Sequence, residues 1–382
     1  MNNPKLSKKG ESTMGNTTEK IATETPLVMA EKACQALMQT FRAEELPPVN
    51  DFHYHQGVFL YGMYRVYQAT GKREYFEYIK SYFDHLIDEY GNVRFARDEL
   101  DSTMAGILLF PLYEETKDPR YMIAAKRLRS ALDTLNRTSE NGFWHKEKYP
   151  NQMWLDGLFM GGPFMLLYSQ HFHEEELIQT VLLQEKLMRK HMTDEKTGLL
   201  YHAWDEKIVQ PWANPETGCS PEFWGRSVGW YGTALIDLLE LLGDRKRGQE
   251  ELIKSLQSFI PAIVNFQDEK TGLWYQIVDK GDLEDNWLES SCSALFLYFI
   301  SKGIQHGFVD DSYRSVVDKA YKGLLEHMVE EKESTLTLGG ICIGTSAGVY
   351  DYYVDRPTSE NDLHGMGAFI LGSMAYYDLI KE

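Results

Sequence analysis

Residues 194–201 have the sequence Asp-Glu-Lys-Thr-Gly-Leu-Leu-Tyr, and residues 268–275 have the nearly identical sequence Asp-Glu-Lys-Thr-Gly-Leu-Trp-Tyr. Each copy follows a charged amphipathic segment and leads into an apolar segment that contains glycine. A motif that recurs at equivalent places between alternating kinds of helix is typical of an array of helical hairpins. The repeat therefore predicts a chain built from repeated pairs of helices.

The same alternation extends over the whole chain. A helix that is apolar on all sides must be buried on all sides, so six such hairpins should close into an inner ring within an outer ring. We therefore predict an all-α fold, an (α/α)6 barrel of six helical hairpins over residues 25–382, with short β-ribbons near 199–203 and 273–277. Charged helices are expected over 26–42, 74–90, 119–137, 174–192, 246–267 and 310–331, and the apolar segments begin near His53, Asp101, Trp154, Trp224, Trp287 and His364.

The composition restricts the classes of partner. The chain of 382 residues has a formal net charge of −18, which argues against nucleic acid or an anionic membrane surface as a partner, because both require a basic face. No stretch reaches the ~18 uncharged apolar residues of a membrane span, and residues 1–24 are polar without the apolar core of a secretory signal. We expect a disordered tail over 1–24 and a cytoplasmic location. The sequence does not indicate an oligomeric state.

The cysteines and histidines do not form a metal-binding pattern. Cys34, Cys219, Cys292 and Cys342 lie far apart, without a CxxC pair, so they are expected to be reduced thiols. The pairs His53-x-His55 and His171-x-His173 lack the spacing of two ligands on one helix face. We therefore predict no metal site.

The candidate site follows from the predicted barrel. Its inner helices all begin at one rim, so residues at those beginnings converge although they are distant in the sequence. The rim collects acids, histidines and one arginine, together with five of the eight tryptophans, which is typical of a pocket that stacks against sugars. The candidates at this rim are Tyr54, Asp101, Trp154, Asp156, His202, Trp224, Arg226 and Trp230.

Asp156 is the strongest candidate for a catalytic residue. It is the one acid within residues 152–164, a run that is otherwise mostly apolar and aromatic. Burial disfavours the charged form of a carboxyl group, which suits a group that must donate a proton. The structural alternative is that Asp156 caps the helix that follows. Arg226 likewise has a structural alternative, because it could pair with Glu222.

Four stretches carry a resemblance to a known family. They are Trp154-Leu-Asp-Gly-Leu-Phe-Met-Gly-Gly-Pro-Phe164, His202-Ala-Trp-Asp205, Ser220-Pro-Glu-Phe-Trp-Gly-Arg-Ser-Val-Gly-Trp230 and Asn361-Asp-Leu-His-Gly365. These stretches resemble the unsaturated rhamnogalacturonyl hydrolases, glycoside hydrolase family 105, and less closely the unsaturated glucuronyl hydrolases of family 88. The resemblance covers about residues 27–380 and also implies an (α/α)6 barrel.

The resemblance implies a reaction. The family hydrates the 4,5-double bond of a terminal unsaturated uronic acid, on oligosaccharides that polysaccharide lyases leave, and usually releases rhamnose. It implies that Asp156 is the general acid and base and that no metal or organic cofactor is needed. Asp101 would hold a sugar hydroxyl and help to keep Asp156 protonated. His202 and Arg226 would contact the substrate, Trp154, Trp224 and Trp230 would form apolar walls, and Tyr54 and His145 are weaker substrate-binding candidates.

Other functions remain open at this level. The chain could be an unsaturated glucuronyl hydrolase, or an inverting glycosidase in which Asp101 and Asp156 act as separate acid and base. It could also be a sugar-binding barrel without catalysis. A sugar epimerase would need several histidines that face the barrel axis, for which His145, His202 and His364 are available.

Overall fold

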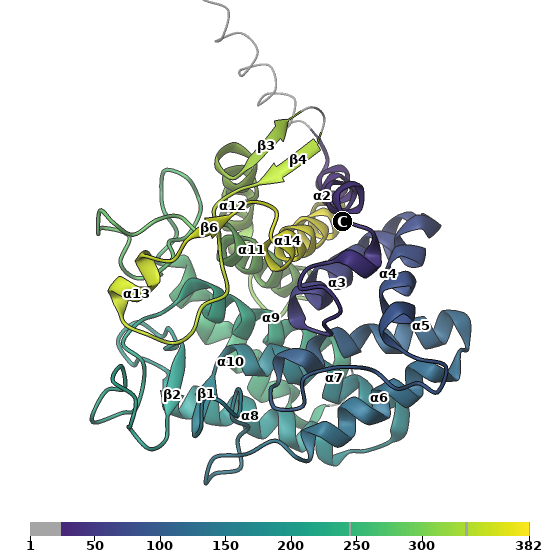
Figure 1. The fold of residues 1–382 in the computed structure, drawn as a ribbon. Helices are drawn as coiled ribbons and strands as arrows, with labels where there is room; N and C mark the ends of the chain where they lie inside the picture. The colour runs from purple at the N-terminus through teal and green to yellow at the C-terminus, as the bar shows by residue number, and fades with distance from the viewer. Residues whose placement is uncertain (1–23, 244–245, 333–334, 382) are drawn as a thin grey trace, which may run out of the picture.

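The computed structural model describes residues 24–243, 246–332 and 335–381, and its helices form two concentric rings (Figure 1). The tail predicted over residues 1–24 lies outside the described residues except for Glu24. None of the described helices is both long enough and apolar enough to cross a membrane.

The inner ring is closed. Each inner helix contacts the next one along the chain, and the last, α14, contacts the first, α3. This arrangement confirms the predicted (α/α)6 barrel. The second inner element begins as a 3-10 helix, η2, which continues directly into α5. The inner elements are α3 (Tyr54–Thr70), η2 (Asp101–Leu108) with α5 (Leu109–Thr116), α7 (Asp156–Phe172), α9 (Gly225–Leu242), α11 (Ser290–Gln305) and α14 (Leu363–Lys381).

Each outer helix after the first packs mainly on the inner helix that precedes it in the chain. The sequence pattern instead suggested that each charged helix pairs with the apolar segment that follows it. The outer helix α4 packs mainly on α3, α8 on α7 and α12 on α11, whereas the first outer helix, α2, packs on the last inner helix. Short connections such as 71–72 make consecutive helices antiparallel neighbours. The long connections run from outer to inner helices and reach the rim where the inner helices begin. The outer helices are α2 (Pro26–Thr40), α4 (Arg73–Leu86), α6 (Pro119–Leu132), α8 (Glu176–Met192), α10 (Lys246–Val264) and α12 (Arg314–His327).

The repeated motif forms the same turn twice. In the first copy, Asp194 Oδ2 accepts bonds from the backbone N–H of Thr197 at 2.9 Å and from its hydroxyl at 2.8 Å. In the second, Asp268 Oδ2 accepts the same two bonds from Thr271 at 2.8 and 2.7 Å. The glycine of the second copy, Gly272, has φ +75, and a Cβ there would lie 2.6 Å from the backbone oxygen of Lys319 on α12. The motif is therefore a structural turn that docks a connection onto the next outer helix.

Short strands form in the long connections. β1 (Gln152–Trp154) pairs antiparallel with β2 (Ala203–Asp205), so the ribbon predicted near 199–203 forms mainly a few residues later. The stretch 273–277 makes isolated bridges through Tyr275 and Ile277 and no strand among the described residues. The remaining short elements are η1 (Ala43–Glu45), η3 (Asp311–Tyr313), β3 (Val329–Lys332), β4 (Thr335–Leu338), β5 (Ile341–Cys342), α13 (Tyr350–Val354) and β6 (Thr358–Ser359).

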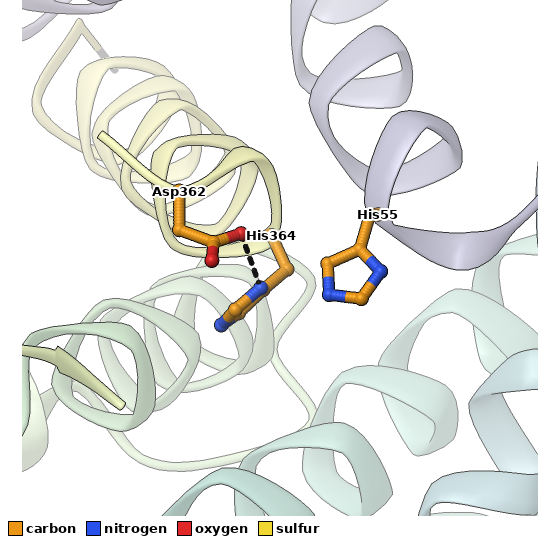
Figure 2. A group of neighbouring side chains, drawn as sticks. All are labelled: His55, Asp362 and His364. Carbon is orange, nitrogen blue, oxygen red and sulfur yellow. Dashed lines mark ion pairs between the residues drawn. The ribbon is translucent and has the colours of Figure 1, made fainter. Parts of the chain in front are cut away.

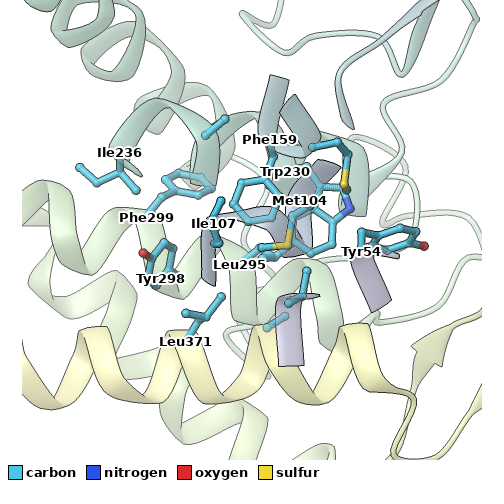
Figure 3. Packing of buried hydrophobic residues seen from close by; sticks show 14 of the residues in the cluster. Tyr54, Met104, Ile107, Phe159, Trp230, Ile236, Leu295, Tyr298, Phe299 and Leu371 are labelled. Carbon is cyan, nitrogen blue, oxygen red and sulfur yellow. The ribbon is translucent and has the colours of Figure 1, made fainter. Parts of the chain in front are cut away.

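The barrel axis is filled with packed side chains (Figure 3). Phe159 stacks on Trp230 with ring centroids 4.9 Å apart, and Met104 lies beside them. These side chains lie between Tyr54 on one side and Ile107 and Tyr298 on the other. The barrel is therefore not an open channel, and each rim must form its own cavity.

Candidate active site

A cavity of about 260 Å³ opens at the rim where the inner helices begin. Its wall is formed by the first residues of α3, η2 and α7, by the connection over 145–149, and by the loop 344–346 that follows β5. The hydroxyls of Tyr149 and Ser346 lie 2.9 Å apart and so join the last two of these segments. Six of the predicted residues line the cavity: Tyr54, Asp101, His145, Trp154, Asp156 and Trp224.

Asp156 is the first residue of α7 and does not cap it. The N-cap position is occupied by Leu155, and no side chain there bonds to the free N–H groups of the helix. Asp156 is 8% exposed, and its Oδ2 is buried without a hydrogen-bond partner in the part of the chain described. A buried polar atom without a partner costs free energy. The capping interpretation is therefore wrong, and the carboxyl group is free to react with a ligand.

His202 lies behind Asp156. Its Nε2 is 3.4 Å from Asp156 Oδ2, and its Nδ1 is 2.7 Å from the hydroxyl of Tyr353. That hydroxyl also accepts the N–H of Gly348 at 3.1 Å. When it donates its own proton to His202 Nδ1, the N–H of the imidazole is at Nε2 and is directed at Asp156.

Asp101 is held in its ionised form. Burial would raise the pKa of its carboxyl group, but His145, Lys146 and His53 together hold that pKa well below its usual range. The ammonium of Lys146 lies 2.5 Å from Asp101 Oδ2 and 2.7 Å from Glu99 Oε2. Because Lys146 balances the charge of Asp101, the like-charge effect on Asp156 expected from the sequence is weakened.

His145 and Trp154 form a stacked layer beside the two acids. Their ring centroids are 4.5 Å apart, and Tyr149 stacks on Trp154 at 4.7 Å. His145 Nε2 lies 3.4 Å from Asp101 Oδ1, and burial lowers the pKa of His145 to about 4. His145 is therefore neutral near pH 7, and it presents a flat surface and one nitrogen to Asp101.

Arg226 does not line the cavity, contrary to its predicted role in contacting the substrate. It is 1% exposed and donates to the backbone oxygens of Cys342 and Ile343, the second at 2.8 Å. It does not pair with Glu222, which binds Lys280 instead. Arg226 holds β5 and thereby positions the loop 344–346 that closes one side of the cavity.

The predicted tryptophan wall is only partly formed. Trp154 and Trp224 line the cavity, but Trp230 is 1% exposed and lies below Tyr54, with ring centroids 6.3 Å apart. Among the other rim tryptophans, Trp204 stacks on His191, away from the cavity. Trp230 is thus a core residue, and spacing alone could not distinguish its position in the second turn of α9 from that of a wall residue.

Within residues 24–243, 246–332 and 335–381, two groups of side chains have ligand atoms close enough to hold a metal ion. The first is His55, Asp362 and His364 (Figure 2), in which His364 Nδ1 lies 2.8 Å from Asp362 Oδ1. The other nitrogen of His364 is 2.9 Å from the guanidinium of Arg226. A fixed positive charge that occupies this nitrogen disfavours a second cation. The group fits a hydrogen-bonded network better than a metal site.

The second group is His53, Glu99 and Asp101. Lys146 forms ion pairs with both of its carboxylates, so an ammonium already occupies the place of a cation. The residues present therefore do not fit a metal here either, and the absence of a metal stays a prediction.

The sequence interpretation missed the lysines. Lys146 and Lys148 line the cavity, and Lys148 has no ion pair with an acid among the described residues. The only signal was the alternation His-Lys-Glu-Lys-Tyr over 145–149, which lies outside any helix. The loop 344–346 was missed because its Gly-Thr-Ser sequence resembles any surface turn.

Comparisons with known proteins agree with this geometry. The model of Glycosyl Hydrolase Family 88 matches residues 29–380. A solved structure of a family 105 glycoside hydrolase from C. acetobutylicum ATCC 824 is 34% identical, with a TM-score of 0.86 over 91% of this chain and 98% of that chain.

Two further proteins extend the comparison. The unsaturated rhamnogalacturonyl hydrolase YesR of Bacillus subtilis (strain 168) is 27% identical over 77% of this chain and 81% of that protein. An unsaturated glucuronyl hydrolase structure from Streptococcus agalactiae is 14% identical with a TM-score of 0.71, over 99% of this chain and 98% of that one, which shows a shared fold. The chain therefore belongs to the glycosyl hydrolases of family 88 and the related family 105, and it is a glycoside hydrolase.

Proposed function

We propose that the enzyme hydrates the 4,5-double bond of a terminal unsaturated galacturonic acid, on oligosaccharides that pectin lyases produce, and that it releases rhamnose or a rhamnose-terminated product. The observation that carries the proposal is the carboxyl group of Asp156. It lies in the wall of the cavity, it does not cap its helix, and its Oδ2 lies 3.4 Å from Nε2 of the buried His202. The relationship to YesR supports the choice of substrate.

In the proposed reaction, Asp156 donates a proton to C4 of the unsaturated ring, and the electron pair of the C4=C5 bond forms the new C–H bond. Positive charge then develops at C5 and is shared with the ring oxygen. Water adds to C5 and gives one proton to the carboxylate of Asp156, which restores the acid. The resulting hemiketal opens to a keto acid and releases the remainder of the oligosaccharide, so that one water is consumed in each cycle.

His202 acts on Asp156 and not on the sugar. After the first proton transfer Asp156 is an anion, and the N–H at His202 Nε2, 3.4 Å from Asp156 Oδ2, stabilises it. A hydrogen bond to the charged form favours that form. His202 is fully buried, so we assign it a positioning role that keeps the carboxylate directed toward C4.

The carboxylate of the substrate needs a local cation, because the chain as a whole carries a net charge of −18. Lys148 lines the cavity and has no acidic partner among the described residues, whereas Lys146 is already committed to Glu99 and Asp101. We assign the contact with the substrate carboxylate to Lys148. The ionised Asp101 accepts hydroxyl protons from the sugar. Because α14 packs on α3 and closes the inner ring, residues 25–382 act as one catalytic domain in this proposal.

The test uses an unsaturated galacturonyl-rhamnose disaccharide and follows the ultraviolet absorbance of the double bond. Wild-type protein should remove the absorbance and release rhamnose, and Asp156→Asn should do neither. Release of rhamnose with unchanged absorbance would instead indicate direct glycosidic cleavage and would contradict the proposal. A wild type that is inactive on this disaccharide but consumes the unsaturated glucuronyl analogue would overturn the choice of substrate and leave the chemistry in place.

A further inference from the structure

The connection between β5 and α14 passes the candidate active site and has two parts. Its first part is the loop 344–346, which forms one side of the cavity. Its second part contains α13 and carries Tyr353, whose hydroxyl lies 2.7 Å from Nδ1 of His202. The first part therefore borders the space for the sugar, and the second part contacts the histidine behind Asp156.

The place of the loop 344–346 depends on Arg226. The guanidinium donates to the backbone oxygen of Cys342 and, at 2.8 Å, to that of Ile343, the last two residues before the loop. The hydroxyl of Thr345 also donates to the oxygen of Ile343 at 2.8 Å. A shift of the guanidinium would therefore move the point at which the loop begins.

Two further side chains fix the guanidinium of Arg226. Nε2 of His364 lies 2.9 Å from Nη1 of Arg226, and Nδ1 of His364 lies 2.8 Å from Oδ1 of Asp362 (Figure 2). A guanidinium can only donate hydrogen bonds, so Nε2 of His364 accepts, and the proton of the imidazole is on Nδ1, beside the carboxylate. His364 is 0% exposed and Arg226 1%, so water does not replace either contact. The chain Asp362–His364–Arg226 thus ends at the loop.

The second part of the connection has anchors of its own. The side-chain amide of Gln276 donates to the backbone oxygen of Tyr353 at 3.0 Å, and the indole of Trp287 donates to that of Val354 at 3.1 Å. Neither anchor includes Arg226 or His364. Tyr353 and His202 should therefore keep their places when the contact between His364 and Arg226 is lost.

We propose that His364 is a positioning residue of this hydrolase, which accepts a hydrogen bond from Arg226 and thereby places the loop 344–346 against the bound sugar. Asp362 fixes the imidazole in the orientation that this requires. The inference rests on the function proposed above. Since the loop is a wall of the cavity and does not contact Asp156 through this chain, loss of the acceptor should weaken substrate binding and leave the chemical step nearly unchanged.

The experiment compares His364→Asn with His364→Gln, which are matched because both replace the buried ring by an amide. The amide of glutamine reaches the place of Nε2 and can accept from Arg226, whereas the amide of asparagine reaches only the place of Nδ1. On the unsaturated galacturonyl-rhamnose disaccharide, His364→Asn should raise KM about tenfold, as for one hydrogen bond to a charged group, with kcat within about twofold of wild type. His364→Gln should keep KM within about threefold of wild type. A residue that only stabilises the fold would affect KM equally in the two variants, and that result would overturn the proposal, as would a lower kcat with unchanged KM.

A second measurement needs no substrate. Hydrogen exchange of the backbone amides, followed by mass spectrometry of the full chain, should become about tenfold faster over 344–346 in His364→Asn, since the loop opens more often. The same segment should exchange nearly as in wild type in His364→Gln, and α13 should be unchanged in both variants. Equal exchange of the loop in His364→Asn and wild type would overturn the positioning role. A wild type that leaves the disaccharide unconsumed would overturn the proposed function instead, and the exchange comparison would still decide the role of His364.

Discussion

The two rims of the barrel each hold a buried aspartate near a lysine and a tyrosine, but the pKa of the carboxyl group is shifted in opposite directions at the two rims. At the rim where the inner helices begin, Lys146 at 2.5 Å helps to hold the pKa of Asp101 well below its usual range. At the other rim, Lys302 lies 3.8 Å from Asp237 and is committed to Glu240. Burial therefore raises the pKa of Asp237 to about 6. Distance to the nearest cation, and not burial alone, decides in which direction the pKa of a buried aspartate is shifted.

The third buried aspartate, Asp156, provides the largest expected effect. Asp156→Asn keeps the shape of the side chain but cannot donate and recover a proton, so we expect kcat to fall by about 10³-fold or more. The measurement is the loss of alkene absorbance per enzyme, with circular dichroism to verify the fold. The matched control is Asp237→Asn at the opposite rim, which should keep nearly the activity of wild type. Equal losses in the two variants would contradict the assignment of the site to one rim.

The second-largest expected effect distinguishes Lys146 from Lys148, the two lysines that line the cavity of the candidate active site. Lys146→Met leaves Asp101 and Glu99 without their ammonium, and loss of one partner of a buried ion pair should lower the free energy of unfolding by about 3 kcal/mol. Lys148→Met removes an exposed charge without an acidic partner, so it should change stability by less than about 0.5 kcal/mol and instead raise KM. Urea unfolding and kinetics on both variants test this pair. A stable Lys146→Met would show that the histidines alone hold Asp101.

The pH dependence of stability should have opposite signs at the two rims. Because the pKa of Asp237 is raised in the folded protein, its ionisation lowers the unfolding free energy as pH rises from about 4 to about 6. The total loss is about 3 kcal/mol. Between pH 4 and pH 8 the unfolding free energy of Asp237→Asn should therefore rise by that amount relative to wild type. Because the pKa of Asp101 is lowered, the unfolding free energy of Asp101→Asn should fall relative to wild type as pH rises toward the unfolded pKa near 4, and the difference should level off above that pH. Unfolding curves at several pH values measure both slopes, and two slopes of the same sign would refute the comparison.

The smallest effect concerns the tautomer of His202. Tyr353→Phe removes the hydroxyl that lies 2.7 Å from His202 Nδ1, so the tautomer of His202 is no longer fixed. We expect kcat to fall about tenfold, as for the loss of one hydrogen bond to a charged group, with a shifted pH–rate profile and little change in KM. A variant with lower stability but an unchanged profile would leave Tyr353 with a structural role alone.

The sequence determined the barrel and the rim. Six alternations of charged and apolar helices, with a turn motif in two copies, were sufficient because burial of an all-round apolar helix requires a closed ring. The sequence also placed Asp101, Asp156 and Trp154 together, since all inner helices begin at the same rim, whereas His145 was a candidate through the family resemblance alone. These conclusions depend on periodicity and chain order, which are local properties of the sequence.

Only the tertiary structure decided which rim residues face the cavity and which lie behind it. Arg226 and Trp230 have the same residue types and spacing that a binding site would use, but packing directs Arg226 to backbone oxygens and Trp230 to Phe159. Lys148 and Asp237 were not foreseen, because their environments consist of segments that are distant in the sequence. The direction of a side chain and its distance to the nearest opposite charge arise from packing between elements, and no local pattern of residues encodes them.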